Sequence, residues 1–270
     1  MPRSIWNGTI TFGLIAVPVK VHSAVEDRGV HFHQVHTADG ARIEQHRFCT
    51  KEGREVPYSE VVKGYEVSQD EYVVLTKDEV AAAAGEGAHV IEIEEFVCQA
   101  EIDPVFYDHT YHLGVREEED AYRLLHDALK RSDRVGLGRW VFHNREYLVA
   151  VRALGAALAL HTMRFADELV PAGKLDIAKP SRKPSDRELD MAEQLVASLH
   201  KQFRPSAFKD TYRDRVAELI KRKAKGEEIE LPEFEEAEAP DDLMAALEAS
   251  LGKKSKAKSN GSKSRSKSRS

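Results

Sequence analysis

The sequence has little cysteine, no long hydrophobic run and none of the short motifs that mark the common enzyme families. Cys49 and Cys98 are its only cysteines, which is too few for a disulfide framework or a four-thiol metal site. No stretch approaches the roughly 18 apolar residues of a membrane span. The first residues lack the apolar core of a signal peptide, and there is no nucleophile elbow, phosphate-binding loop or dinucleotide fingerprint. These absences predict a cytoplasmic protein that has no membrane contact, cofactor or catalytic site.

Charge is abundant but separated by sign along the chain. The 46 acidic and 40 basic residues give a net charge of −6, which alone would argue against nucleic acid. Residues 226–250 hold ten acids and no Lys or Arg, whereas residues 251–270 hold eight Lys or Arg and no acid. The net charge therefore describes no single surface.

The basic segment 251–270 is predicted to be a disordered tail, because it has almost nothing apolar to bury. Cations without acids attract phosphates through counterion release, whatever the base sequence. A solubility tail, or a binder of any polyanion, is the alternative. The candidate DNA contacts in the tail are Lys253, Lys254, Lys256 and Lys258.

The stretch from Arg28 to Tyr65 differs from the segments on either side. Val30, Phe32 and Val35 alternate with histidines and reach Asp39-Gly40, a strong hairpin signal. So polar a ribbon cannot make a core of its own, and long connections inside compact domains are usually functional or disordered. We interpret it as an arm that presents cations and imidazoles to something outside. An ordinary surface excursion is the alternative, because its six Lys or Arg face five acids.

Short alternating segments surround this arm. Many short strands with few helices predict a mainly β fold with some α, arranged as a barrel or closed sandwich. Helices are predicted at 77–84 and at 117–131, where Leu124, Leu125, Ala128 and Leu129 should face inward. Strands are predicted in residues 4–21 (two, joined at 13–16), at 72–75 (buried), 89–96 and 105–113, and in a meander over 140–163.

The character of the chain changes at Pro171. After a basic linker, Ser185 should cap a helix, with Glu188 completing the capping box. A second helix follows over 208–225, and the apolar face of each needs a partner surface, which could be the barrel, a second copy or another protein. The predicted divisions are a barrel core at 1–170 with its arm at 28–66, the linker and helices at 171–225, an acidic linker at 226–250 and the tail at 251–270.

The arm histidines raise one catalytic alternative, a metal-dependent enzyme. His31, His33 and His36 have a spacing that a strand permits, but no carboxylate or cysteine pattern near them matches a known ligand set. The turn at Cys49 resembles a metal knuckle that lacks its second cysteine, so zinc is disfavoured. No metal is therefore predicted.

Several motifs together resemble bacterial Ku proteins in family order over roughly residues 1–225. They are SIWNGTITFGL at 4–14, VPVK at 17–20, EVPY at 55–58, KGYE at 63–66, YVVLT at 72–76, IEIEEF at 91–96, EIDP at 101–104 and AEQL at 192–195. The resemblance implies a Ku-type β-barrel and a homodimer whose paired arms close a ring around double-stranded DNA ends. It also implies a bacterial, nucleoid-associated role in joining double-strand breaks with an ATP-dependent DNA ligase, ligase D.

A ring of this kind needs contacts to phosphate and sugar rather than to base edges. The residues that we expect to line it are Lys20, Arg28, Arg42, His46, Arg47, Lys51, Arg54 and Lys63. Helix 208–225 matches the family region implicated in ligase contact, where the candidates are Tyr212, Arg215, Leu219 and Arg222. A chromatin-compacting protein that acts through its tail and needs no DNA ends is the remaining alternative.

Overall fold

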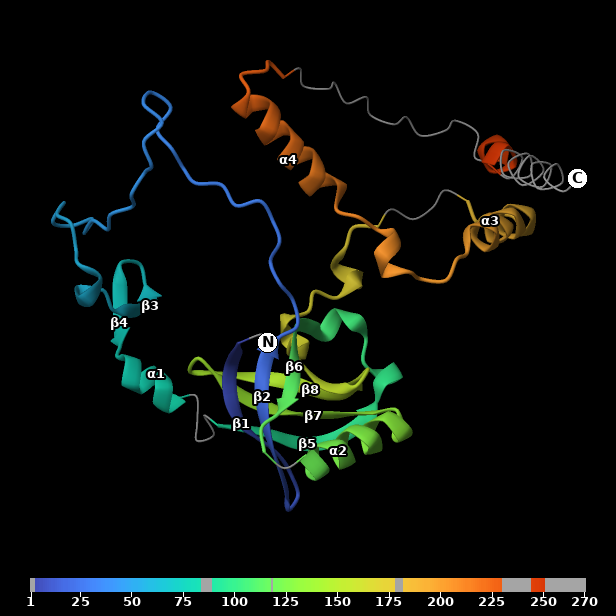
Figure 1. The fold of residues 1–270 in the computed structure, drawn as a ribbon, viewed down its shortest axis with the longest axis horizontal. Coiled ribbons are helices and arrows are strands. Elements are labelled where there is room, and N and C mark those ends of the chain that lie inside the picture. Colours follow the sequence, from blue (N-terminus) through green and yellow to red (C-terminus); the bar gives the residue numbers. More distant parts are fainter. Residues whose placement is uncertain (1–2, 84–88, 118, 178–181, 230–243, 251–270) are drawn as a thin grey trace, which may run out of the picture. The chain divides into compact units, whose positions relative to one another are not determined.

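The computed structural model describes residues 3–83, 89–117, 119–177, 182–229 and 244–250 (Figure 1). The chain divides into two compact units, residues 1–175 and 176–270. The predicted basic tail with its four candidate lysines, part of the basic linker and most of the acidic segment lie outside the described residues. So does residue 84, the predicted end of the first helix.

Seven strands close a β-barrel in the order β1-β2-β6-β9-β8-β7-β5 (Figure 1). Their bounds are β1 (Ser4–Phe12), β2 (Ile15–Ser23), β5 (Val90–Cys98), β6 (Tyr107–Val115), β7 (Arg134–Phe142), β8 (Arg145–Leu154) and β9 (Ala157–Met163). The barrel closes where β1 and β5 pair in parallel, and its other neighbouring strands are antiparallel. The predicted β-barrel is confirmed.

The barrel core follows from alternation along the strands. Val17, Val19 and Val21 of β2 are fully buried, as are Val149 and Val151 of β8. Side chains two apart in a strand lie on the same face, so one face of each strand fills the interior.

One close approach in the wall requires glycine. A Cβ on Gly138 of β7 would lie 1.8 Å from the carbonyl oxygen of Glu92. The register between β5 and β7 shifts just beyond this point, between Ile93 and Glu95. Residues with a side chain are therefore excluded at Gly138.

Helix α2 (Glu119–Ser132) packs Tyr122, Leu125 and Leu129 into the same core. The Tyr122 hydroxyl donates to the Leu113 carbonyl at 2.6 Å and accepts from the Leu158 amide at 2.8 Å. The prediction that Leu124 and Ala128 face inward is wrong, since both are exposed. The buried face consists of Tyr122, Leu125, His126 and Leu129, spaced i, i+3, i+4 and i+7, and Leu124 and Ala128 each lie one position outside it.

The arm is inserted between β2 and β5 and carries its own elements. These are a 3-10 turn η1 (Tyr58–Glu60), strands β3 (Lys63–Ser68) and β4 (Glu71–Leu75), and helix α1 (Lys77–Ala83). None of the described residues from Val25 to Thr76 is buried. The predicted strand at Tyr72–Leu75 is present, but its prediction as buried is wrong. Within the described part of the chain, β4 pairs only with β3, in a two-stranded sheet.

The second unit is helical in the residues that the structure describes. Helix α3 (Asp186–Leu199) begins as predicted, because the Ser185 hydroxyl accepts from the Glu188 amide and the Glu188 carboxylate accepts from the Ser185 amide. Helix α4 (Thr211–Ala224) follows, and residues 244–250 are also helical. Every described helix is too short or too polar to span a lipid bilayer.

Short 3-10 turns connect these elements. They are η2 (Gln99–Glu101), η3 (Pro104–Phe106), η4 (Ala166–Glu168), η5 (Ala172–Lys174) and η6 (Pro205–Ala207). The strand predicted from Val105 therefore begins two residues later, at Tyr107, because Pro104 starts a 3-10 turn that Asp103 caps.

Candidate nucleic-acid interface

The arm contains two tight turns with the same backbone hydrogen bonds. The Gly40 amide donates to the His36 carbonyl at 2.9 Å, and the Gly53 amide donates to the Cys49 carbonyl at 2.8 Å. Both glycines have a positive φ, 70° and 66°, which few other residues adopt at low cost. The two turns lie thirteen residues apart and share a Thr-x-x-Gly spacing, a repeat that the sequence analysis did not use.

Each turn closes a small hairpin and places cations at the surface. Isolated bridges join Val35 to Arg42 and Phe48 to Glu55. The predicted alternation therefore produces two short hairpins rather than long regular strands. Lys51 lies within the second turn and is exposed.

Arg28 and Arg54 each pair with an acid two residues away in sequence. The Arg28 guanidinium lies 2.8 Å from Glu26, and Arg54 Nε donates to Glu52. All four side chains are more than half exposed. Exposed pairs contribute little and are screened by salt, so both guanidinium groups stay available for exchange onto phosphate.

The other predicted cations of the arm differ from these two. Arg42, Lys51 and Lys63 form no ion pair with any described carboxylate. Arg47 stacks over the ring of Tyr58, with its guanidinium carbon 5.0 Å from the ring centroid. This cation–π contact ties the second hairpin to η1 at the base of the β3–β4 hairpin.

His46 is held between two carboxylates. Its Nδ1 lies 2.6 Å from Glu55 Oε1, and its Nε2 lies 3.7 Å from Glu44 Oε2. The hydrogen bond and charge of Glu55 raise the pKa of His46 above its ordinary value. Protonation of this exposed ring adds a cation to the arm at a pH where an unpaired histidine would be neutral.

Lys20 lies apart from the other predicted cations. It belongs to barrel strand β2, where it pairs with Asn7 of β1 and Gly114 of β6, and it is half-buried. The structure therefore gathers seven of the eight predicted arm-region residues on the arm and places the eighth on the barrel wall.

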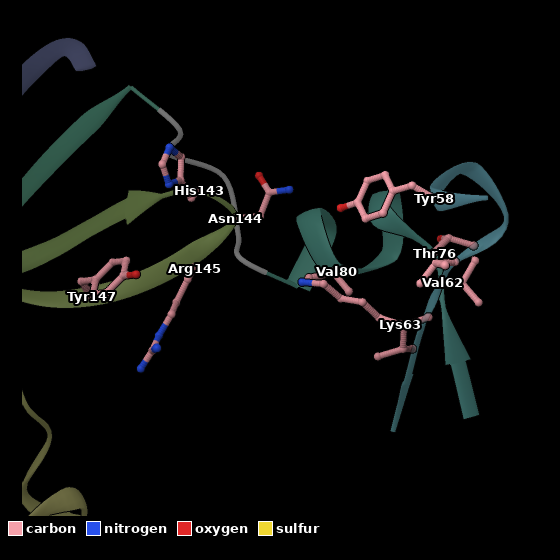
Figure 2. A pocket seen from close by; sticks show the side chains of 11 residues that line it. Tyr58, Val62, Lys63, Thr76, Val80, His143, Asn144, Arg145 and Tyr147 are labelled. Atoms are coloured by element: carbon pink, nitrogen blue, oxygen red, sulfur yellow. The ribbon is translucent and has the colours of Figure 1, made fainter. Parts of the chain in front are cut away.

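A cavity of about 670 Å3 lies between the base of the arm and the turn that joins β7 to β8 (Figure 2). The sequence analysis placed this turn only within a predicted meander over 140–163. The barrel side consists of His143, Asn144, Arg145 and Tyr147, and the arm side of Tyr58, Val61, Val62, Lys63, Leu75, Thr76 and Val80.

The turn on the barrel side is a two-residue hairpin in an uncommon conformation. His143 and Asn144 both have a positive φ, 51° and 60°, and Phe142 pairs with Arg145 across the hairpin. Such turns favour Asn-Gly, and a bulkier residue adopts this backbone at a cost. Stacked aromatic rings stabilise this turn. The ring centroid of Phe142 lies 4.5 Å from that of Trp140 and 3.9 Å from that of His143.

The predicted ligase contacts all lie on α4 of the second unit. Tyr212, Arg215, Leu219 and Arg222 follow each other at intervals of three or four residues, so they share one helix face. Tyr212 is 65% exposed and Leu219 is 38% exposed. Arg222 Nε lies 2.8 Å from Glu227 Oε2.

The described residues contain no group of three His, Cys, Asp or Glu side chains that could hold a metal ion. Two of the three arm histidines that raised this question are paired individually with carboxylates, His31 with Asp27 at 3.6 Å and His36 with Asp39 at 3.1 Å. The described part of the chain therefore offers no support for the metal-dependent alternative.

The described residues thus form a closed barrel that carries a long arm with exposed cations. A family model described as the Ku70/Ku80 beta-barrel domain matches residues 11–191. The chain belongs to the Ku family.

Named relatives are similar over nearly the whole chain. "Non-homologous end joining protein Ku" of Anaeromyxobacter sp. (strain K) is 48% identical over 254 residues, 93% of this chain and 86% of that protein. The protein of the same name from Heliobacterium modesticaldum is 38% identical over 92% of this chain and 91% of its own length. "Non-homologous end joining protein Ku 1" of Geotalea uraniireducens is 36% identical over 91% of this chain and 95% of its own length.

Proposed function

We propose that this protein binds the ends of double-stranded DNA in non-homologous end joining, without catalysis of its own, as a homodimer that forms a ring. The observation that carries the proposal is that no described residue of the arm is buried from Val25 to Thr76. Family membership and the names of the relatives support the same role.

The β3–β4 hairpin supports the homodimer. Tyr65, Val67 and Val74 are each more than half exposed, and the two strands pair only with each other. A two-stranded hairpin is marginally stable in water unless something packs against it. A second copy supplies the same apolar surface through a two-fold axis, which is the commonest symmetry of soluble oligomers.

A ring explains how modest charge suffices. Arg42, Arg47 and Lys51 are exposed on the arm, but acids accompany them, so the arm is no dense basic patch. An open cleft would need such a patch to hold DNA, whereas a closed ring retains a linear polymer by topology. Phosphate contacts then need only fix position, and they read no sequence.

The second unit and the tail extend this proposal. The exposed face of α4 with Tyr212 and Leu219 recruits and stimulates the ATP-dependent ligase D. The basic tail 251–270 adds affinity for internal DNA at the nucleoid. In this arrangement, the core with its arm ends near residue 170, and the linker and helices continue to residue 225.

The test compares linear DNA with covalently closed DNA of the same sequence in a gel shift. The proposal predicts binding to linear DNA and little to closed circles, since a ring loads only at an end. Equal binding to both forms would contradict it. Deletion of residues 252–270 distinguishes the ring from a chromatin-compacting protein that acts through its tail. The compacting protein should lose nearly all DNA binding, whereas a ring should keep its preference for DNA ends.

A further inference from the structure

Among the described residues, the second hairpin of the arm (residues 47–56) has a cation–π contact and the first hairpin (residues 34–43) has none. The Arg47 guanidinium lies over the ring of Tyr58, with its central carbon 5.0 Å from the ring centroid. We infer that Tyr58 is a positioning residue, whose ring holds the Arg47 guanidinium in place to bind a phosphate of the DNA backbone. The inference rests on the proposed end-binding function and assigns to that function a residue that carries no charge.

The cation–π contact is not needed to form such a hairpin. The two hairpins repeat at an offset of thirteen residues, and the backbone hydrogen bonds and isolated bridge of the first recur at the matching positions of the second. In the first hairpin, Gln34 and Gln45 stand where the second has Arg47 and Tyr58. Because the first hairpin forms without an aromatic ring at this position, the fold of the hairpin does not account for the Tyr58 ring.

Backbone geometry fixes the Tyr58 ring beside Arg47. The Val56 amide donates to the Arg47 carbonyl at 2.8 Å, so these two residues lie opposite each other in the hairpin. Only Pro57 separates this pair from Tyr58, and its φ of −60° is set by the proline ring. Tyr58 then begins η1, where the Glu60 amide donates to the Pro57 carbonyl at 2.9 Å. The chain therefore leaves the hairpin in one fixed direction, with the Tyr58 ring against the guanidinium.

The contact leaves the hydrogen-bonding edge of the Arg47 guanidinium free. This guanidinium donates no hydrogen bond to, and forms no ion pair with, any described residue. A guanidinium stacked on a ring keeps its planar N–H groups pointing outward, in the fork that matches two oxygens of a phosphate. Because its plane is held in advance, less side-chain entropy is lost when the phosphate binds. Arg54, which donates to Glu52, must first leave its acid.

The two arginines of the second hairpin lie on one of its faces. The Cys49 amide donates to the Arg54 carbonyl at 2.9 Å, which places these two residues opposite each other. Side chains alternate along a strand, so Arg47 shares their face. Phe48, which bridges to Glu55, lies on the other face. A ring that holds Arg47 therefore acts on the cationic face, and Phe48 offers a control on the opposite face.

The experiment measures binding of the full-length chain to a linear duplex by fluorescence anisotropy. Tyr58→Leu should weaken binding about two- to fivefold for each arm that contacts the DNA, the size of an exposed cation–π contact. Tyr58→Phe should bind as the wild type does, because it keeps the ring and the Tyr58 hydroxyl forms no hydrogen bond with a described residue. No loss in Tyr58→Leu, or the same loss in Tyr58→Phe, overturns the inference.

The matched control is Phe48→Leu, which removes a ring from the same hairpin. Phe48 is 62% exposed, and no cation of the described residues lies over its ring. Its removal should leave DNA affinity unchanged. A loss equal to that of Tyr58→Leu would show that any ring of the hairpin serves, and would overturn the assignment to Tyr58.

A double-mutant cycle separates positioning from a structural role. Arg47→Gln removes the cation, so Tyr58→Leu added to that variant should cause no further loss of affinity. Tyr58→Leu alone should lower the salt slope by no more than roughly 0.9 for each arm, the value of one phosphate contact. Collapse of the hairpin would also remove the contacts of Lys51 and Arg54. Losses that multiply in the double variant, or a larger drop in slope, overturn the inference.

Failure of the end-binding proposal appears in a different measurement. Closed circles would then bind as well as linear DNA, whatever the coupling between Arg47 and Tyr58. Sedimentation of Tyr58→Leu should give the same oligomeric state as the wild type, because the surface proposed for the second copy lies on β3 and β4. A change of oligomeric state would assign the ring to the subunit interface and would overturn the inference.

Discussion

Valine side chains are buried in the strands of the barrel but exposed in the strands of the arm. Val17 and Val19 of β2 are fully buried, whereas Val73 and Val74 of β4 are about half exposed. Both segments are strands with apolar side chains, but the barrel strands have neighbours on both sides and β4 has only β3. The difference teaches that β-propensity predicts a strand, while burial depends on what covers it.

The first prediction compares how much a buried ring of the barrel and an exposed ring of the arm contribute to the free energy of unfolding. Trp140→Ala in the barrel should lower the free energy of unfolding by about 3–5 kcal/mol, because it empties a fully buried aromatic site. Phe32→Ala in the arm, where the ring is 69% exposed, should change it by less than about 0.5 kcal/mol. Denaturant unfolding of each variant measures both values. A large loss from Phe32→Ala would show that the arm has a core of its own.

The second prediction concerns variants in which cations of the arm are reversed and the barrel is left unchanged. Reversal of Arg42, Arg47 and Arg54 to Glu should weaken linear DNA binding on the order of 100-fold and reduce the salt slope by roughly 0.9 for each lost phosphate contact. Anisotropy over a salt series measures both. The matched control reverses Arg123, Lys130 and Arg131, exposed cations of α2, and should retain most of the affinity. If the arm variant binds normally, the arm does not face DNA.

The barrel also contains a histidine that differs from those of the arm. His161 is 6% exposed, and Arg152 Nε donates to its Nε2 at 2.9 Å. Burial, aided by the nearby guanidinium, lowers the pKa of His161 to about 4. The unfolded chain therefore takes up this proton first, near the ordinary value of 6.5, and the free energy of unfolding falls as pH drops from about 6.5 toward 4.

The third prediction follows from that difference. His161→Gln should flatten the loss of stability between about pH 6.5 and 4, while His33→Gln on the exposed arm should leave it unchanged. Thermal unfolding across this pH range supplies the measurement. A steep acid loss that persists in His161→Gln would assign the effect to other groups.

Part of this molecule could be predicted from sequence because the signals are local. Alternation predicted most of the barrel strands, although β7 begins at Arg134 and not at residue 140 as predicted, and Ser185 with Glu188 predicted the start of α3. The exposure of Leu124 and of β4 could not be predicted, because it depends on the exact helix face and on which strands pair. Likewise, the local sequence indicates a turn at His143-Asn144, but the position of this turn beside the arm base depends on contacts between residues distant in the chain.

The fourth prediction concerns the smallest effect, the pH dependence of DNA binding. Because Glu55 raises the pKa of His46, the ring stays protonated above the ordinary pH range and loses its charge as pH rises further. DNA affinity should therefore fall a few-fold with rising pH, about the effect of one phosphate contact. His46→Gln should remove that dependence in anisotropy titrations. An unchanged pH profile in this variant would exclude His46 from the interface.

Encirclement is the central claim, and topological retention tests it most directly. The protein is loaded on a linear duplex, both DNA ends are then blocked by a bulky bound protein, and the complex is challenged with high salt. The account predicts that the protein stays on DNA whose ends are blocked and leaves DNA whose ends are open. Equal loss from both would show that the arms do not close around DNA.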